Sequence, residues 1–421
     1  MSEKALVIGA GITGLFTTLY LAREGIDVTL IDRDNILSGT SGKFHGMLHS
    51  GARYSTNDQV SARECMAENR KLSEIASKYI INTGGYFVAV SEEEADFGNK
   101  LAKTNGECGI PTEEVDLEEF LKLREPGIGE NAVRVFSVPD KVIHAYGLGM
   151  SVASEAVMNG AKISPNTNFK MLDSEEIIFP GHEWLNGKFD FLFNTAGPWI
   201  MDVAKSLKME GVQISPALGL MSVYPGRWVN SVINRMRPPS DGDILVPYGE
   251  NTILGTMAVL TDNMESVDIE EEDIEEMAEE GSLLLPVLKN LRPIRNYYST
   301  RPLIVSENEN AREITRDYLI LQEEKKTLRS CAVVGGKFTT ARAMGSKLAS
   351  IGLGKDVDSI GKEKLDLNSS SELFLEKNGF KEFVSSIESR KGTIDEDLTA
   401  NSTPAMVDYL IRKLNGKTNS K

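Results

Sequence analysis

Cysteine is scarce in this chain of 421 residues, and the three that occur, Cys65, Cys108 and Cys331, lie far apart without CxxC spacing. This pattern excludes a disulfide framework and gives no sign of a zinc or iron–sulfur site, so we expect reduced, mostly buried thiols and no metal centre. Long apolar runs are also missing, and no stretch approaches the roughly 18 residues that cross a bilayer. We expect a cytoplasmic protein without a signal peptide, and peripheral attachment at the inner face of the cell membrane stays open.

Acidic residues outnumber basic residues in this chain. The chain has 62 Asp and Glu against 46 Lys and Arg, which gives a formal net charge of −16. Such a surface disfavours nucleic acid as a partner and repels small anions at long range. An anionic substrate must therefore be captured locally by a few basic side chains. The length exceeds one usual hydrophobic core, so we predict two domains and an appendage.

The first part of the chain carries a pattern typical of a dinucleotide site. A strand over 4–8 runs into the glycine-rich turn Gly9-Ala-Gly11-Ile-Thr-Gly14, and a helix over 13–24 follows. A second strand over 27–31 then ends in an acid, Asp32. Apolar strands on both sides and an acid about 20 residues after the glycines make this pattern more specific than glycines alone.

Each glycine of this turn has a physical role, and so has the acid. Gly9 allows the tight turn, Gly11 lets the backbone approach a pyrophosphate, and Gly14 brings the helix against the sheet. The positive N-terminus of the helix then faces the phosphates, and Asp32 accepts hydrogen bonds from ribose hydroxyls.

A second strand–glycine–helix junction lies near the end of the chain, in Arg329–Thr340. Two such junctions fit FAD better than NAD, because the first holds the pyrophosphate while the second, at 336–340, points its helix dipole at the developing charge on the flavin. We predict noncovalent FAD. The candidate cofactor-binding residues are Gly9, Gly11, Gly14, Asp32, Arg33, Thr40, Ser41, Gly197, Gly335, Gly336, Thr339 and Thr340.

The other elements predict an α/β fold in which an FAD-binding Rossmann-like domain is interleaved with an α+β substrate domain. The apolar run 189–197 fits a buried central strand, and strands within 211–322 predict an antiparallel sheet. Helices are predicted at 59–79, 92–105, 117–124 and 147–159. The acidic run 262–280 is predicted to be a solvated helix. The predicted domains are 1–80, 141–210 and 325–355 for FAD, 81–140 and 211–324 for substrate, and a short helical C-terminal tail at 356–421, with helices near 372–385 and 404–414.

Several longer segments carry a family resemblance. They are 45–54 (His-Gly-Met-Leu-His-Ser-Gly-Ala-Arg-Tyr), 61–69, 233–247, 298–303 and 335–342. On these segments the chain resembles the FAD-dependent glycerol-3-phosphate dehydrogenases of the D-amino-acid-oxidase-like (DAO) superfamily, most closely the A subunits of the anaerobic enzymes. The resemblance covers residues 4 to about 352.

The resemblance implies oxidation of sn-glycerol 3-phosphate to dihydroxyacetone phosphate, with hydride passing from C2 to flavin N5. Arg53 and Arg301 would then clamp the phosphate of the small substrate. A structural ion pair for Arg53 and a solvated charge for Arg301 are the alternatives to this role.

The C2 hydroxyl proton needs a base, and histidine is the commonest candidate near neutral pH. The four histidines are His45, His49, His144 and His182. We predict His49 as the catalytic base because its motif should face the flavin, with Tyr54 and Lys337 as catalytic alternatives. His49 as a simple hydrogen-bonding residue stays open.

Two other functions remain as alternatives. One is an FAD-dependent oxidase or dehydrogenase of a 2-hydroxy acid such as L-2-hydroxyglutarate, whose enzymes share a similar His-Ser-Gly loop. Arg53 does not exclude it, since a carboxylate also binds arginine. The other is a flavin-holding subunit with little turnover of its own. The second alternative rests on two departures from the family: Leu218 replaces a usual lysine, and Ala341 replaces a usual tyrosine. A further departure is Met221, which stands where aerobic relatives carry histidine.

The route by which electrons leave is not specified by the sequence. The chain lacks the cysteines of the cysteine-rich C-terminal region of the anaerobic A subunits. We therefore expect oxygen, a quinone or a separate redox protein as the electron acceptor, and a homo-oligomer stays open.

Overall fold

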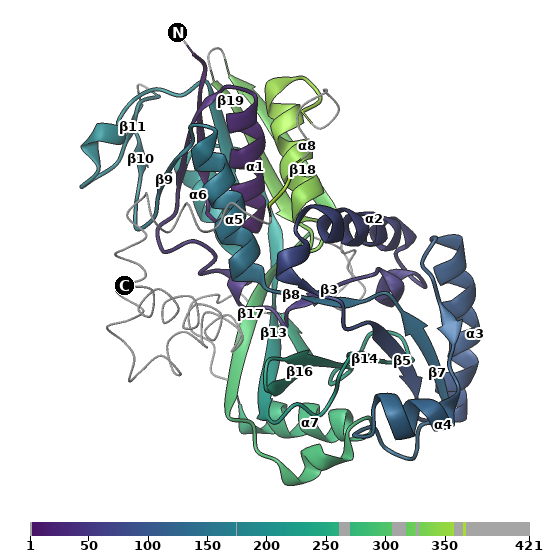
Figure 1. The fold of residues 1–421 in the computed structure, drawn as a ribbon. Helices are drawn as coiled ribbons and strands as arrows, with labels where there is room; N and C mark the ends of the chain where they lie inside the picture. The colour runs from purple at the N-terminus through teal and green to yellow at the C-terminus, as the bar shows by residue number, and fades with distance from the viewer. Residues whose placement is uncertain are drawn as a thin grey trace, which may run out of the picture.

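Two large β-sheets organise the chain, one in the upper half and one in the lower half of Figure 1. They are seen in a computed structural model, which describes residues 2–173, 175–260, 270–304, 317–325, 328–357 and 365–367. All three cysteines are free and buried, which confirms the prediction of buried thiols.

The upper sheet has six strands in the order β18-β19-β12-β1-β2-β9. All neighbours are parallel except β18 and β19, which pair antiparallel at one edge. The strands are β1 (Lys4–Ile8), β2 (Asp27–Ile31), β9 (Lys162–Ser164), β12 (Phe191–Asn194), β18 (Tyr318–Lys325) and β19 (Leu328–Gly335). The apolar strand β12 lies buried between β1 and β19, as predicted.

Helices cover both faces of this sheet because its strands are apolar on both sides. Ala5 and Val7 of β1 pack in the core with α1, α5 and α8, whereas Leu6 and Ile8 pack in the core with α6. Figure 1 shows α1 between α5 and α8. The helices are α1 (Ile12–Arg23), α5 (Ala145–Met158), α6 (Ile200–Ser206) and α8 (Ala341–Leu353).

The lower sheet has eight strands in the order β17-β13-β16-β15-β14-β5-β7-β6. Only the β14–β5 pair is parallel, so the predicted antiparallel sheet is confirmed. The strands are β5 (Gly85–Ala89), β6 (Glu113–Glu114), β7 (Arg134–Val138), β13 (Ile214–Pro225), β14 (Val232–Arg235), β15 (Ile244–Tyr248), β16 (Asn251–Leu260) and β17 (Arg295–Ile304). The helices that accompany them are α3 (Glu92–Glu107), α4 (Leu117–Glu119), continued as a π-helix over Phe120–Arg124, and α7 (Glu271–Ser282).

A small sheet and the helix α2 (Gln59–Ile75) lie between the two halves. The small sheet joins β3 (Met47–Leu48), β8 (Lys141–Ile143) and β4 (Ile80–Ile81). The helix α2 ends before the predicted Tyr79, because the chain turns through a 3₁₀ segment, buries Tyr79 completely and enters β4. Pairing with β8 therefore overrides the helical periodicity of the sequence.

One boundary differs from the predicted domains. The strand β18 falls within the predicted substrate segment 211–324, yet it pairs with β19 in the upper sheet. Backbone hydrogen bonding along all of β18 accounts for this placement. We propose that the chain crosses between domains after β17, and we keep the other predicted boundaries as a proposal.

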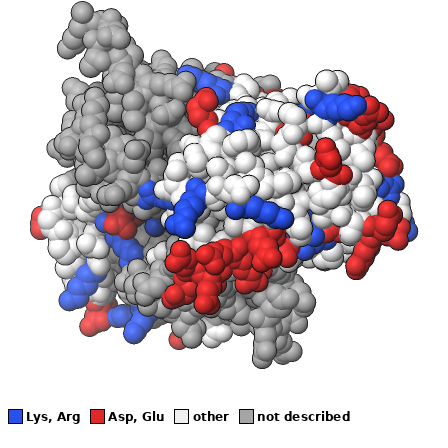
Figure 2. Space-filling model, turned by 90° about the horizontal axis from the view of Figure 1, so that it is seen from below, with Lys and Arg blue, Asp and Glu red and all other residues white. Residues whose placement is uncertain are grey.

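The acidic helix α7 begins at Glu271, and Met277 is its buried contact with the lower sheet. Its acidic residues Glu271, Glu272, Glu275, Glu276 and Glu279 are exposed, as expected for a solvated helix. Figure 2 shows acidic side chains gathered on this underside of the molecule. The predicted start of this helix at 262–269, and the predicted tail helices at 372–385 and 404–414, lie outside the described residues.

No helix in the described part of the chain is both long enough and apolar enough to cross a bilayer.

Candidate active site

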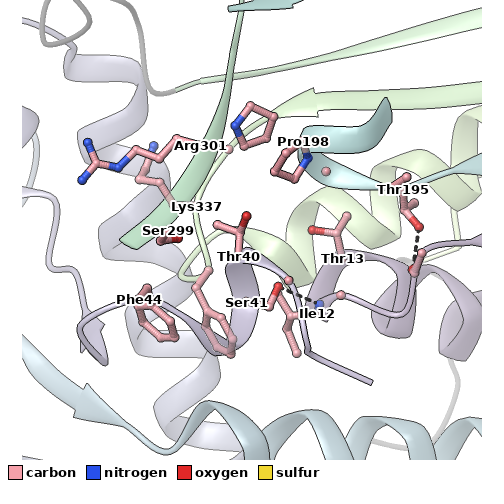
Figure 3. Close-up of a pocket in the computed structure, with 18 of the residues that line it drawn as sticks. Ile12, Thr13, Thr40, Ser41, Phe44, Thr195, Pro198, Ser299, Arg301 and Lys337 are labelled. Carbon is pink, nitrogen blue, oxygen red and sulfur yellow. Dashed lines mark hydrogen bonds between the residues drawn. The ribbon is translucent and has the colours of Figure 1, made fainter. Parts of the chain in front are cut away.

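A cavity of about 650 Å³ is lined by residues from both large sheets. It opens beyond the carboxyl ends of β1, β2, β12 and β19, which is where ligands bind in open α/β sheets. On the other side it meets β13, β15, β16 and β17 of the lower sheet. Figure 3 shows Arg301, Lys337 and Phe44 on one side of the cavity and Thr13 and Thr195 on the other.

The turn between β1 and α1 is built so that two of its glycines cannot carry a side chain. Gly9 has φ of +108°, and a Cβ there would lie 2.6 Å from the carbonyl oxygen of Thr195. A Cβ on Gly14 would lie 1.9 Å from the carbonyl oxygen of Gly9. The close helix–strand contact predicted for Gly14 is therefore present.

Gly11 differs from these two glycines because it faces open space. Its nearest neighbour is the Ser41 hydroxyl, 3.3 Å from a Cβ built on Gly11. The same Ser41 Oγ accepts a hydrogen bond of 3.1 Å from the Ile12 amide at the start of α1 (Figure 3). The backbone at Gly11 is thus open to a ligand at the positive end of a helix.

Asp32 is held at the end of β2 by two backbone amides. Its carboxylate accepts hydrogen bonds from Ala10 (2.6 Å) and Asp34 (2.8 Å). Burial outweighs these bonds and raises the pKa of Asp32 to about 6. Next to it, the guanidinium of Arg33 lies 4.4 Å from the ring centre of Trp199, a contact that the sequence did not reveal.

Most of the predicted cofactor residues line the cavity. They are Gly9, Gly11, Asp32, Arg33, Thr40, Ser41, Gly197, Gly335 and Gly336. Gly14, Thr339 and Thr340 do not line it. The hydroxyls of Thr339 and Thr340 are fully buried and accept hydrogen bonds from the backbone amides of His49 and Lys337, respectively. These threonines fix the loops that line the cavity.

The three predicted catalytic candidates come together from two distant segments. The rings of His49 and Tyr54 lie 5.4 Å apart, and Lys337 Nζ lies 4.9 Å from the centre of the Tyr54 ring. The backbone of His49 is held by the Thr339 hydroxyl and by the Asn69 amide, which donates to the His49 carbonyl at 3.3 Å. A buried side chain with a fixed backbone can hold a defined geometry towards a substrate.

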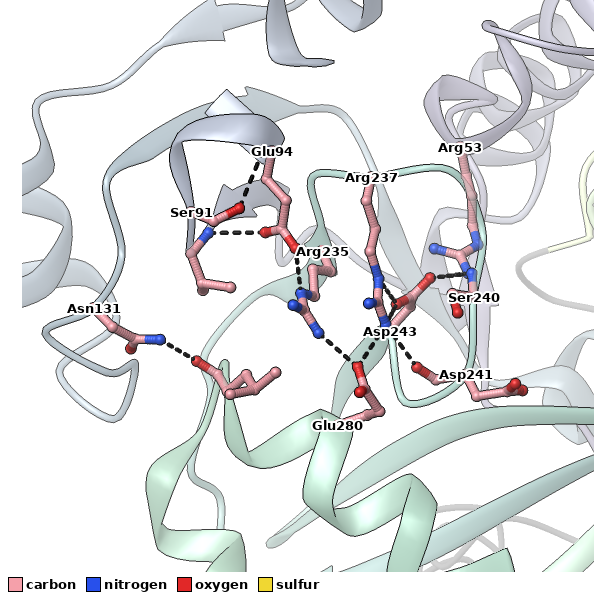
Figure 4. A network of polar contacts seen from close by, with 12 residues as sticks. Arg53, Ser91, Glu94, Asn131, Arg235, Arg237, Ser240, Asp241, Asp243 and Glu280 are labelled. Atoms are coloured by element: carbon pink, nitrogen blue, oxygen red, sulfur yellow. Dashed lines mark hydrogen bonds and ion pairs between the residues drawn. The ribbon is translucent and has the colours of Figure 1, made fainter. Parts of the chain in front are cut away.

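Arg53 is buried and forms an ion pair. Its Nη2 lies 3.1 Å from Asp243, which also accepts a hydrogen bond from Arg237 and one from the amide of Ser240. Through Glu280 and Arg235 this network continues to Glu94 on α3 (Figure 4). The structural ion pair considered for Arg53 is therefore present.

The ion pair uses only part of the Arg53 guanidinium. Nη1 is buried without a hydrogen-bond partner among the described residues. A buried donor that lacks a partner carries a free-energy cost of about 1–3 kcal/mol, so an acceptor supplied by a ligand would be stabilised there.

Arg301 lies on β17 and reaches the cavity across β13. Its guanidinium packs over Gly219, where a Cβ would come within 2.5 Å of Nη2. The absence of a side chain at Gly219 therefore makes room for Arg301. Of the residues that depart from the family, Met221 lines the cavity, whereas Leu218 is buried in β13 and Ala341 begins α8.

Three features of the site were not assigned from the sequence. Phe44 and Phe338 stack with ring centres 4.7 Å apart in the cavity wall. Asp243 anchors Arg53, and His45 lines the cavity beside His49. Phe44, Phe338 and His45 all adjoin or belong to the segments that carry the family resemblance, which is the only signal that pointed to them.

The glycine-rich turn, the acid at the end of β2 and the two-sheet cavity define a flavoprotein oxidoreductase of the DAO type. A family model described as FAD dependent oxidoreductase matches residues 4–351, and the chain belongs to this family. Its cofactor is therefore FAD, as predicted.

Two relatives agree with the resemblance seen in the sequence. The A1 subunit of the anaerobic glycerol-3-phosphate dehydrogenase of Haloferax volcanii is 33% identical over 370 residues, or 83% of this chain and 63% of that protein. The A subunit of the anaerobic glycerol-3-phosphate dehydrogenase of Escherichia coli (strain K12) is 31% identical over 356 residues, or 82% of this chain and 65% of that protein. The chain thus spans slightly less than two thirds of the length of these relatives.

Solved flavoproteins of low sequence identity share the fold. L-alpha-glycerophosphate oxidase from Mycoplasma pneumoniae, with FAD bound, matches with a TM-score of 0.69 at 18% identity and covers 87% of this chain and 98% of its own. Glycine oxidase from Geobacillus kaustophilus matches with a TM-score of 0.66 at 17% identity, covering 87% of this chain and 99% of its own. These matches confirm the predicted fold class.

Proposed function

We propose that this chain is an FAD-dependent dehydrogenase that oxidises sn-glycerol 3-phosphate to dihydroxyacetone phosphate. The observation that carries the proposal is that Arg53, Arg301 and His49 line the same cavity as the glycine-rich turn. The names of the relatives at 31–33% identity support this substrate over a 2-hydroxy acid.

The residues of the cavity suit FAD. We place the pyrophosphate at Gly11, where the backbone is open, and the adenosine ribose at Asp32. Phe44, Phe338 and Lys337, which line the cavity together with His49, would hold the flavin. FAD, when bound, takes up the hydride that leaves C2 of the substrate.

The substrate would be bound and deprotonated by the chain's own side chains. Arg53 Nη1 and the Arg301 guanidinium donate to the phosphate, which supplies the local capture that a net charge of −16 requires. His49 accepts the proton of the C2 hydroxyl as the hydride leaves, and Tyr54 and Lys337 are the alternatives for this step.

The relatives are named as subunits of larger enzymes, so we also propose that this chain passes its electrons to a separate redox protein or a quinone. We also propose that the chain attaches peripherally to a membrane and that it associates with further copies of itself. The electron acceptor is tested by measuring quinone reduction by the FAD-loaded chain after purification with and without its native membrane fraction.

The substrate is tested by dye reduction in steady state. The FAD-loaded chain should reduce an artificial dye with sn-glycerol 3-phosphate, and inorganic phosphate should compete with this substrate. L-2-hydroxyglutarate and glycerol serve as controls. Turnover with the hydroxy acid alone would overturn the proposed substrate, and full FAD loading without turnover on any of them would favour the flavin-holding role.

A further inference from the structure

A second histidine, His45, lines the cavity and has no part in the function proposed so far. It precedes Gly46, which has φ of +82° and on which a Cβ would lie 2.2 Å from the ring of Tyr248. Only glycine fits this turn. The turn brings the Met47 amide to within 3.1 Å of His45 Nδ1, to which it donates a hydrogen bond.

This hydrogen bond fixes the tautomer of His45. Because Nδ1 accepts a hydrogen bond from the Met47 amide, the single proton of the neutral ring must lie on Nε2. Burial, together with the positive charges of Arg301 and Arg53, lowers the pKa of His45 to about 3. Near neutral pH the ring is therefore uncharged and presents an N–H donor at Nε2.

His45 lines the cavity, and Nε2 is the ring nitrogen that is not engaged with the Met47 amide. The His45 ring is held against Phe44 (centroids 5.9 Å apart) and edge-on to His49 (5.7 Å). No other hydrogen bond joins His45 to the residues that the structure describes, yet Nε2 is not sealed in the core. The cavity wall beside Arg53 and Arg301 thus carries a third donor, which is neutral.

We propose that His45 is a specificity-determining residue, whose Nε2–H donates a hydrogen bond to a phosphate oxygen of the substrate alongside Arg53 and Arg301. This inference rests on the proposed function, because it deepens the same site. Three non-bridging oxygens of a phosphate monoester require several donors and no acceptor, and these three side chains offer only donors.

The geometry also divides the work between the two histidines. His45 cannot serve as the base in its resting tautomer, since Nδ1 is engaged with the Met47 amide and Nε2 already carries the proton. In the proposed site, His49 accepts the proton, and His45 binds the phosphate of the substrate.

The test compares His45→Phe with His45→Gln, since glutamine restores an N–H donor and phenylalanine does not. His182→Gln is the control, because His182 lies outside the cavity. In the FAD-loaded protein, His45→Phe should raise KM for sn-glycerol 3-phosphate about tenfold or more, the cost of a hydrogen bond to a charged group, with a smaller change in kcat. His45→Gln should recover most of this loss, and FAD affinity should stay at the wild-type value in all three variants.

A second readout is the binding of inorganic phosphate alone to the FAD-loaded protein, measured by calorimetry. His45→Phe should weaken it by a similar factor. An unchanged KM and unchanged phosphate affinity in His45→Phe would overturn the role of His45, as would a loss that His45→Gln fails to recover. If the wild type is not reduced by sn-glycerol 3-phosphate, the proposed function fails separately, while phosphate binding still decides whether His45 is an anion-binding donor.

Discussion

Buried charges in the cavity are fixed by neighbours before a ligand binds. The Asp32 carboxylate accepts hydrogen bonds from two backbone amides at the end of β2, and the Arg53 guanidinium forms an ion pair with Asp243. The place of Asp32 at the end of β2 was predicted from its distance to the glycines, and its role at the ribose stays a prediction. Asp243 was not predicted, because it lies 190 residues from Arg53 in the sequence and nothing local marks the contact.

The raised pKa of Asp32 predicts a pH dependence of FAD binding. The ionised carboxylate is the form that accepts two ribose hydroxyls, and it predominates above a pKa of about 6. FAD affinity should therefore be constant above this pH and should fall as the pH drops below it. Flavin fluorescence titrations between pH 5 and about pH 8 measure this.

Asp32→Asn is the matched variant for this experiment. It should bind FAD more weakly at neutral pH and lose the change around pH 6. A wild-type affinity that does not respond to pH over this interval would contradict the assignment of Asp32 to the ribose.

Arg301→Ala tests the phosphate role of the second arginine. Removing a charge-assisted donor should raise KM for sn-glycerol 3-phosphate by roughly 10- to 100-fold, or about 1.5–3 kcal/mol, while FAD remains bound. Arg63→Ala is the control, because Arg63 is exposed on α2, where it donates to the side chain of Gln59. Loss of flavin from Arg301→Ala, with KM unchanged in the molecules that keep it, would be incompatible with this role.

At the scale of elements, the junction of β1, the glycine turn and α1 follows from local sequence alone. The φ of Gly9 and the close contact at Gly14 need glycine, and the spacing between them fixes the turn. The ends of other elements depend on distant partners. The helix α2 stops at Ile75 because the next residues enter β4 and pair with β8.

Gly11→Val separates cofactor binding from folding. A side chain at Gly11 meets only the Ser41 hydroxyl, so the chain should fold, but it would block the approach of the pyrophosphate to the backbone. We expect a protein with native circular dichroism that retains no FAD. Gly106→Ala on α3, where a Cβ meets nothing within 4 Å, should keep both fold and flavin. Full FAD loading of Gly11→Val would show that the pyrophosphate lies elsewhere.

A buried ion pair joins α2 to helices α1 and α8 of the upper half. Arg342 on α8 donates to both carboxylate oxygens of Glu68 on α2 (2.9 and 2.7 Å), and also to the Tyr20 hydroxyl on α1. Glu68→Ala breaks this buried ion pair by removing the carboxylate that accepts two hydrogen bonds from Arg342, so the free energy of unfolding should fall by about 3–5 kcal/mol.

Denaturant titration with Glu118→Ala as the control measures this effect. Glu118 pairs with Lys122 at the surface, and its loss should cost about 0.5 kcal/mol or less. Equal effects of the two substitutions would mean that the buried pair contributes no more than a solvated one.

At the scale of the whole molecule, the chain carries a net negative charge but places several basic side chains in its cavity. The net charge is −16, and acidic residues gather on the underside (Figure 2), yet Arg53, Arg301 and Lys337 line the cavity. The contrast fits local capture of an anion, as the composition predicted.

Much of this architecture could be predicted because it is encoded locally. The nucleotide turn, the central strand β12 and the antiparallel lower sheet all follow from periodicity and glycine spacing. The sequence did not place β18 in the correct sheet, because the hydrophobic pattern of a strand does not determine which of two sheets it joins. In the structure β18 pairs with β19. The role of His45 was also hidden, because its tautomer depends on a turn at Gly46.

The most direct test of the proposed function is a single turnover. The purified, FAD-loaded chain is mixed with sn-glycerol 3-phosphate without oxygen, and the visible absorbance of the flavin is followed. Rapid and complete bleaching is the predicted result, because hydride from C2 reduces the cofactor without any acceptor. A flavin that stays oxidised with sn-glycerol 3-phosphate but bleaches with dithionite would contradict the proposed function.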